Sequence, residues 1–82
     1  MKNIYMWVEI DNKLMRELRF ATHEEALAFV VRVTMLAEKV NHHPDIYFTY
    51  SRVLLSLCTH DAGNSITQKD RQMAEKIDAL LG

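Results

Sequence analysis

The chain has 82 residues, of which 49% are hydrophobic and 26% charged, and its formal net charge at pH 7 is −1. This balance is typical of a globular protein and excludes a disordered or collagen-like chain. The length predicts a single domain over residues 1–82. A near-zero net charge gives no long-range attraction for phosphate backbones, so it argues against direct binding of nucleic acid.

The N-terminal residues contain no apolar stretch long enough for a signal peptide or a membrane span, because Glu9 and Asp11 follow closely on Trp7. Cys58 is the only cysteine, which excludes a disulfide within the chain and suits a reducing compartment. We therefore expect a cytoplasmic protein that does not interact with membranes.

The first twenty residues alternate as a β-hairpin does. One alternating run covers residues 5–10, with Tyr5 and Trp7 on one side, and a second covers residues 14–20. Asp11 and Asn12 between them favour a tight turn. In the second run, the residues expected to share the inner face are Leu14, Leu18 and Phe20.

A helix is predicted to begin after Thr22, because Thr22 and Glu25 have the spacing of a capping box that satisfies backbone amides. Apolar residues then recur at steps of three and four, as in a helix lying on a sheet. The stripe consists of Ala26, Val30, Val33, Ala37 and Val40. Pro44 disfavours helical geometry at His43, so the helix must end before it.

The second half repeats this order. Strands are predicted over residues 46–50 and 53–59, a loop over 61–65, and a last helix capped by the segment Thr67–Asp70. The buried side of that helix is expected to carry Met73, Ala74, Ile77, Leu80 and Leu81. Paired strands between helices indicate an α+β fold, with a four-stranded antiparallel sheet and two helices on one face.

Three of the four histidines lie at element ends, where a rigid frame presents side chains to solvent. His42 and His43 follow the first helix, and His60 follows the fourth strand. Glu38 precedes His42 by one helical turn, and a carboxylate there can fix the tautomer of a histidine. Because histidine gives and takes protons near neutral pH, this pattern indicates an acid/base pocket suited to adding or eliminating water.

Spacing alone leaves other interpretations open. Surface histidines with local hydrogen bonds would show the same pattern. Histidines with Glu38 also supply ligand types for zinc or iron, although adjacent histidines in an extended segment point to opposite sides. Cys58 precedes His60 by two residues, but it belongs to an apolar run that is typical of a packed side chain.

Longer motifs resemble one known family. The segment Ala37–Asp45 reads A-E-K-V-N-H-H-P-D, and the T-H pair that ends at His60 follows His42 by eighteen positions. With the Thr67–Asp70 segment, these residues resemble the pterin-4a-carbinolamine dehydratases. The resemblance extends back to Trp7 and forward to Asp78, so it covers nearly the whole chain.

The resemblance implies a hydro-lyase that removes water from 4a-hydroxytetrahydropterin, giving quinonoid dihydropterin in the recycling of tetrahydropterin for an aromatic amino acid hydroxylase. By position, His42 and His60 match the histidines that act as general acid and base, and Glu38 matches the carboxylate beside them. The residues that would bind the pterin are His43, Asn41 and Thr59. The resemblance implies no metal and no other cofactor.

Three features depart from the family pattern. The family usually has a helix before the tryptophan, and we expect that N-terminal helix to be missing here. Ile46 occupies a position where an aromatic is common, and the loop at residues 63–66 is one residue longer. Family members form dimers or tetramers, and exposed apolar strand faces favour a homodimer or homotetramer here. A non-catalytic dimerisation, assembly or regulatory module with the same fold is the alternative function.

Overall fold

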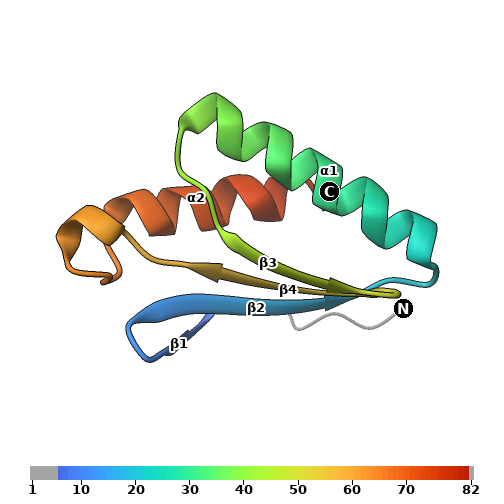
Figure 1. Cartoon of the computed structure of the whole chain (residues 1–82), viewed down its shortest axis with the longest axis horizontal. Coiled ribbons are helices and arrows are strands. Elements are labelled where there is room, and N and C mark those ends of the chain that lie inside the picture. The colour runs from blue at the N-terminus through green and yellow to red at the C-terminus, as the bar shows by residue number, and fades with distance from the viewer. Residues whose placement is uncertain (1–5, 82) are drawn as a thin grey trace.

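The computed structural model describes residues 6–81. The elements in chain order are β1 (Val8–Ile10), β2 (Lys13–Arg19), α1 (His23–Val40), β3 (Asp45–Thr49), β4 (Arg52–Leu57), the short 3-10 helix η1 (His60–Ala62) and α2 (Gln68–Ala79). The strands form one antiparallel sheet in the order β1-β2-β4-β3. Both helices lie over the same face of this sheet (Figure 1). The α+β fold with the order ββαββα is therefore confirmed.

The first hairpin turns through two residues. Asp11 and Asn12 have φ angles of 51° and 62°, in the left-handed region that two-residue hairpin turns require. The first strand is shorter than the predicted range of residues 5–10. It begins at Val8, and Tyr5 lies outside the described residues.

The inner face of β2 contains a charged residue that the predicted pattern omitted. Leu14, Arg16 and Leu18 are buried there, and Arg16 is only 7% exposed. Its guanidinium forms an ion pair with Asp78 of α2, and the same carboxylate oxygen accepts a hydrogen bond from Trp7 Nε1 at 2.9 Å. A buried charge requires such a partner, so this contact fixes β2 against α2.

Helix α1 begins as predicted. The Thr22 hydroxyl accepts a hydrogen bond from the Glu25 amide at 3.1 Å, and the Glu25 carboxylate accepts one from the Ala21 amide at 3.3 Å. Its fully buried residues are Ala26, Phe29, Val33 and Ala37. Phe29 was missing from the predicted stripe, and Val30 and Val40 of that stripe are only half-buried. The buried face of α1 is therefore rotated slightly about the helix axis relative to the predicted stripe.

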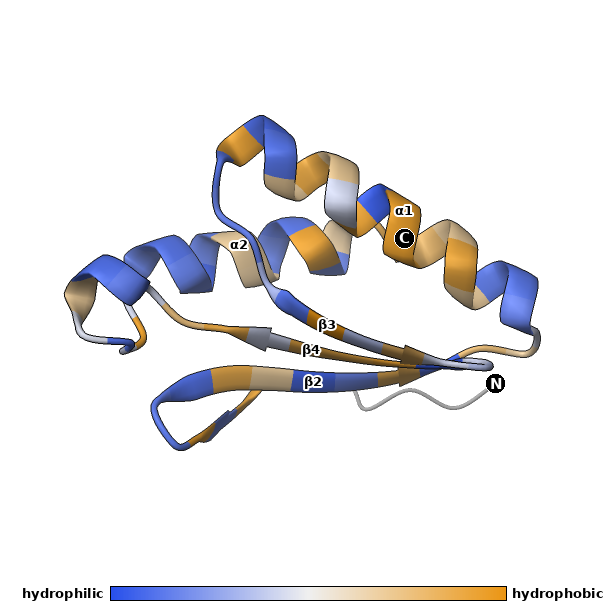
Figure 2. Cartoon of the chain, viewed as in Figure 1, coloured by the Kyte–Doolittle hydropathy of each residue, from blue (hydrophilic) through white to orange (hydrophobic). Residues whose placement is uncertain are grey.

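The core lies between the sheet and the two helices. Val53, Leu55 and Leu57 of β4 are each 0% exposed, and they form one core cluster with the buried apolar residues of α1 and α2. The buried stripe of α2 consists of Asp70, Met73, Ala74 and Ile77. Figure 2 shows hydrophobic and hydrophilic segments alternating along both helices, as expected for helices with one buried side. Within residues 6–81, neither helix is long and apolar enough to cross a membrane.

The second pair of strands lies close to its predicted ranges. β3 begins and ends one residue earlier than expected, and β4 ends at Leu57 rather than residue 59. Thr59 instead forms an isolated bridge with Ser65, which closes the loop between β4 and α2. The predicted site residues Thr59 and His60 therefore lie in the loop after β4, which the Thr59–Ser65 bridge closes.

Candidate functional site

The end of α1 sets the direction of the histidine pair. Asn41 adopts the left-handed conformation, with φ 56° and ψ 44°, and its amide donates to the Ala37 carbonyl. The His42 amide donates to the same carbonyl at 3.2 Å. This is a common way to end a helix, and asparagine tolerates the left-handed region better than most residues. The chain consequently turns away from the helix axis at His42.

His42 is anchored to a buried carboxylate of α2. Its Nε2 lies 2.6 Å from Oδ1 of Asp70, and the Asp70 side chain is 0% exposed. The other oxygen, Oδ2, accepts hydrogen bonds from the Thr59 hydroxyl at 2.7 Å and from the Thr67 amide at 2.8 Å. The Thr67 contact belongs to the capping box of α2. One carboxylate therefore both caps a helix and orients a histidine.

These contacts fix the charge of Asp70. Burial alone would raise the pKa of Asp70, but hydrogen bonds from the Thr67 amide, His42 and Thr59, together with attraction to His42, hold that pKa below its ordinary value. An ionised carboxylate only accepts hydrogen bonds, so His42 must carry a proton on Nε2. In the neutral ring, Nδ1 is then the acceptor.

His60 begins η1, directly after Thr59. Its Nδ1 lies 2.6 Å from Oδ1 of Asn64. Because that oxygen accepts, the ring donates from Nδ1 and leaves Nε2 for other contacts. The loop is closed by a hydrogen bond from the Thr59 amide to the Ser65 carbonyl at 2.8 Å. His60 is thus presented by a short loop that is closed at its base.

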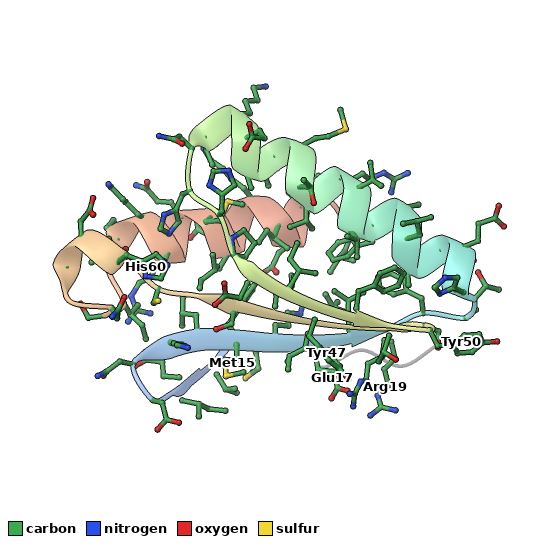
Figure 3. The ribbon with its side chains drawn as sticks, in the orientation of Figure 1. Met15, Glu17, Arg19, Tyr47, Tyr50 and His60 are labelled. Atoms are coloured by element: carbon green, nitrogen blue, oxygen red, sulfur yellow. The ribbon has the colours of Figure 1, made fainter. Side chains whose placement is uncertain are left out.

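The end of α1, the end of β4 and the start of α2 surround a hollow of about 350 Å³, which we call the histidine pocket. Its volume lies within the range of small-molecule sites. The predicted site residues that line it are Asn41, His42, His43, Thr59 and His60. Figure 3 shows His60 at this end of the molecule, beyond the strand ends. Two histidines from different elements, His42 and His60, therefore line one concavity.

Glu38 is placed differently from the other predicted site residues. We expected its carboxylate to reach the histidine pair at the end of α1, and it lies 2.6 Å from Nε2 of His43, but it does not contact His42 or line the pocket. The side chains of Glu38 and His43 are 74% and 51% exposed, and an exposed pair of this kind adds little stability. The reason is the left-handed Asn41, which ends the helical rise before His42 and directs that ring toward α2.

Asp70 is the functional candidate that the sequence analysis missed, although a signal for it was present. In the sequence analysis it appeared only within the segment Thr67–Asp70, as part of a helix cap and of the family resemblance, and it was not named as a site residue. Asp70, Met73, Ala74 and Ile77 have the spacing i, i+3, i+4, i+7, which places a carboxylate on the buried side of α2. The further charged residues that line the pocket, which the sequence analysis did not name as site residues, are Asp45, Asp61 and Lys69.

The other interpretations of these residues can be compared with the geometry. Within residues 6–81, no three His, Cys, Asp or Glu side chains gather closely enough to hold a metal ion. Cys58 lines the pocket but is 7% exposed and packed at the end of β4. The arrangement therefore provides polar groups that can accept and donate protons around a cavity with an apolar part.

Comparison with known proteins places this site in a family context. The family model described as Pterin 4 alpha carbinolamine dehydratase matches residues 1–80. A protein of Chloroflexus aurantiacus, named "Putative pterin-4-alpha-carbinolamine dehydratase", is 46% identical over 76 residues, which cover 93% of this chain and 81% of that protein.

Solved structures show the same similarity. A transcriptional coactivator/pterin dehydratase from Brucella melitensis is 33% identical, with a TM-score of 0.85, and the match covers 93% of this chain and 82% of that one. A pterin dehydratase-like protein identified as a RuBisCO assembly factor in the alpha-carboxysome has a TM-score of 0.82 at 24% identity, covering 96% and 93% of the two chains. The second match concerns the fold alone.

Proposed function

This chain belongs to the pterin-4a-carbinolamine dehydratase family, and on that premise we propose that it converts 4a-hydroxytetrahydropterin to quinonoid dihydropterin and water. The supporting observation is that His42, His43 and His60 line one pocket, with His42 anchored to the buried Asp70. As a 4a-hydroxytetrahydrobiopterin dehydratase in the cytoplasm, it would act on the carbinolamine released by an aromatic amino acid hydroxylase and supply the quinonoid dihydropterin that a reductase returns to tetrahydropterin.

The proposed reaction needs one base and one acid. The base removes the proton from N5, the N5–H electron pair forms the double bond between N5 and C4a, and the C4a–O bond breaks. The acid protonates the departing hydroxyl, which leaves as water. No group is oxidised or reduced, so side chains that exchange protons are sufficient.

We assign the base to His42 and the acid to His60. Asp70 holds the Nε2 proton of His42, so the neutral ring offers Nδ1 to the substrate. Once His42 has taken the N5 proton, its positive charge lies next to the ionised Asp70, which stabilises it. His60 is exposed, so it can recover its proton from solvent between turnovers. His43, Asn41 and Thr59 line the same pocket and are the proposed contacts for the pterin.

Stopped-flow measurement of carbinolamine decay tests this function. Wild type should accelerate decay over buffer, and His42→Ala and His60→Ala should each lower kcat by roughly 10²-fold or more, which is the usual contribution of a general acid or base. His23→Ala is the matched control, because His23 lies at the start of α1, stacked on Phe48 and outside the pocket. Wild type that leaves decay at the buffer rate would show the proposal to be wrong.

The alternative is a non-catalytic assembly or regulatory module. It is favoured by one observation, that a protein with this fold is identified as a RuBisCO assembly factor. The two functions predict different effects of mutations in the pocket. A module would keep its partner affinity in His42→Ala and show no pterin turnover, whereas the dehydratase would lose turnover in that variant.

A further inference from the structure

A second hollow adjoins the histidine pocket. It has a volume of about 230 Å³ and shares Asn41, His42 and Lys69 with that pocket. The end of α1 forms one wall, and α2, which runs beneath that end in Figure 1, forms the other. A molecule bound against His42 could therefore extend into this second space without leaving the protein surface.

The wall contributed by α2 is basic. Lys69, Gln72, Met73 and Lys76 have the spacing i, i+3, i+4, i+7, so they form one stripe of the helix. Met73 is buried and forms the floor, while the two lysines and Gln72 are exposed. We call this hollow the lysine subsite.

The lysine subsite lacks a counter-charge. Its lining includes no Asp or Glu, and within residues 6–81 neither Lys69 nor Lys76 takes part in an ion pair. The adjoining histidine pocket differs, because Asp45 and Asp61 line it together with Lys69. Positive charge is thus concentrated in the hollow that those two carboxylates do not line.

We infer that the lysine subsite binds an anionic group on the substituent of the pterin, so that the substrate is a pterin with a phosphate or carboxylate on its side chain. This inference rests on the proposed function, which places the pterin ring in the histidine pocket. Lysine ammonium groups and the Gln72 amide donate hydrogen bonds to either kind of anion. A neutral hydroxylated side chain would leave both lysines unpaired.

Binding of unreactive dihydropterins tests the inference without requiring turnover. The probes are 7,8-dihydropterins with a polyhydroxypropyl substituent, either unmodified, with a terminal phosphate, or with a terminal carboxylate, each titrated by calorimetry. We expect wild type to bind at least one anionic probe roughly threefold to tenfold more tightly than the neutral one. Because the lysines are exposed, this preference should shrink at high ionic strength. The tighter anionic probe identifies the kind of anion.

Variants connect the preference to the subsite. Lys76→Gln should weaken the preference for the anionic probe, because it removes one of the two charges of the subsite and keeps a hydrogen-bond donor. Lys39→Gln makes the same charge change on the exposed side of α1, outside both hollows, and it should retain the wild-type preference.

Three outcomes would overturn the inference. Equal affinity of wild type for neutral and anionic probes would do so, as would an equal loss of preference in the Lys39 and Lys76 variants. If either result accompanied accelerated carbinolamine decay, the subsite would be wrong and the dehydratase would stand. No binding of any probe together with no acceleration would remove both proposals.

Discussion

At the scale of single residues, Asp70 couples the site to the stability of the fold. Its pKa is lower in the folded protein than its ordinary value, so the ionised carboxylate stabilises the fold above the unfolded-state pKa of about 4. That contribution is lost as the pH falls through the folded-state pKa. Stability near neutral pH therefore depends partly on a residue of the proposed catalytic apparatus.

Replacing Asp70 by asparagine tests this coupling. We expect Asp70→Asn to lower the free energy of unfolding at neutral pH by about 1–3 kcal/mol, because buried hydrogen bonds to a charged group are lost. The deficit relative to wild type should narrow as the pH falls from about 4 toward the folded-state pKa of Asp70, because the ionised carboxylate contributes progressively less to wild-type stability over that range. Urea denaturation followed by circular dichroism over a pH series measures both effects. Glu75→Gln, an exposed carboxylate change on the same helix, is the control, and a deficit that stays constant with pH would contradict the expectation.

The contrast between Asp70 and Glu38 shows what the sequence could and could not reveal about the site. The histidine positions followed from element ends and from a motif, both of which are local. The carboxylate partner of His42 lies 28 positions away, and local spacing favoured Glu38 because it is one helical turn before His42. Whether His42 contacts Glu38 or Asp70 depends on the backbone conformation of Asn41 and on the packing of α2. A short sequence pattern predicts neither of these.

At the scale of elements, Asn41 both ends α1 and lines the pocket. Most residues with a Cβ are strained in the left-handed conformation, and asparagine tolerates it better than they do. Glycine has no Cβ and is not strained there. We expect Asn41→Ala to be about 1 kcal/mol less stable than Asn41→Gly in thermal or urea denaturation. Equal stability of the two variants would contradict the structural role.

The same pair of variants separates stability from binding. Asn41→Gly preserves the backbone turn and removes the side-chain amide. A lower pterin affinity in the glycine variant, at unchanged stability, would assign the amide to substrate contact. Unchanged affinity would limit Asn41 to ending the helix.

Helix starts were predictable from the sequence, and polar residues inside the fold were not. Thr22 and Thr67 begin helices because hydroxyl caps obey spacing rules that hold in isolation. Arg16 interrupts the inner face of β2, and its partner Asp78 lies 62 positions away. A strand pattern that alternates apolar and polar residues does not predict a buried arginine. The burial of Arg16 is explained by the packing of α2 against the sheet.

At the scale of the whole molecule, the face of the sheet opposite the helices exposes apolar side chains beside charged ones such as Glu17 and Arg19. Val8, Ile10 and Tyr47 are 42%, 47% and 56% exposed, and Figure 3 shows Met15 and Tyr47 on this side. Large exposed apolar patches usually mark an interaction surface. We propose that this outer face contributes to a homodimer or homotetramer.

Sedimentation equilibrium tests the oligomer. We expect wild type to have a mass above that of one chain, and Ile10→Glu to weaken self-association by at least about tenfold, because a buried unpaired charge is costly. Val31→Glu is a matched control, since Val31 is also 47% exposed but lies on α1. A monomeric wild type would exclude this proposal, and a larger effect of Val31→Glu would move the interface to α1.

The contact between Trp7, Arg16 and Asp78 also bears on how the chain is made. The partner of Trp7 lies 71 positions later in the sequence, and the guanidinium of Arg16 is buried against the same carboxylate. During synthesis, the hairpin emerges from the ribosome long before residue 78 does. Until residue 78 is available, the Arg16 guanidinium has no Asp78 carboxylate to pair with and stays in water. The inner face of β2 therefore cannot be buried against α2. The fold can therefore be completed only after translation of α2, and the only tryptophan of the chain lies at a contact that cannot form earlier.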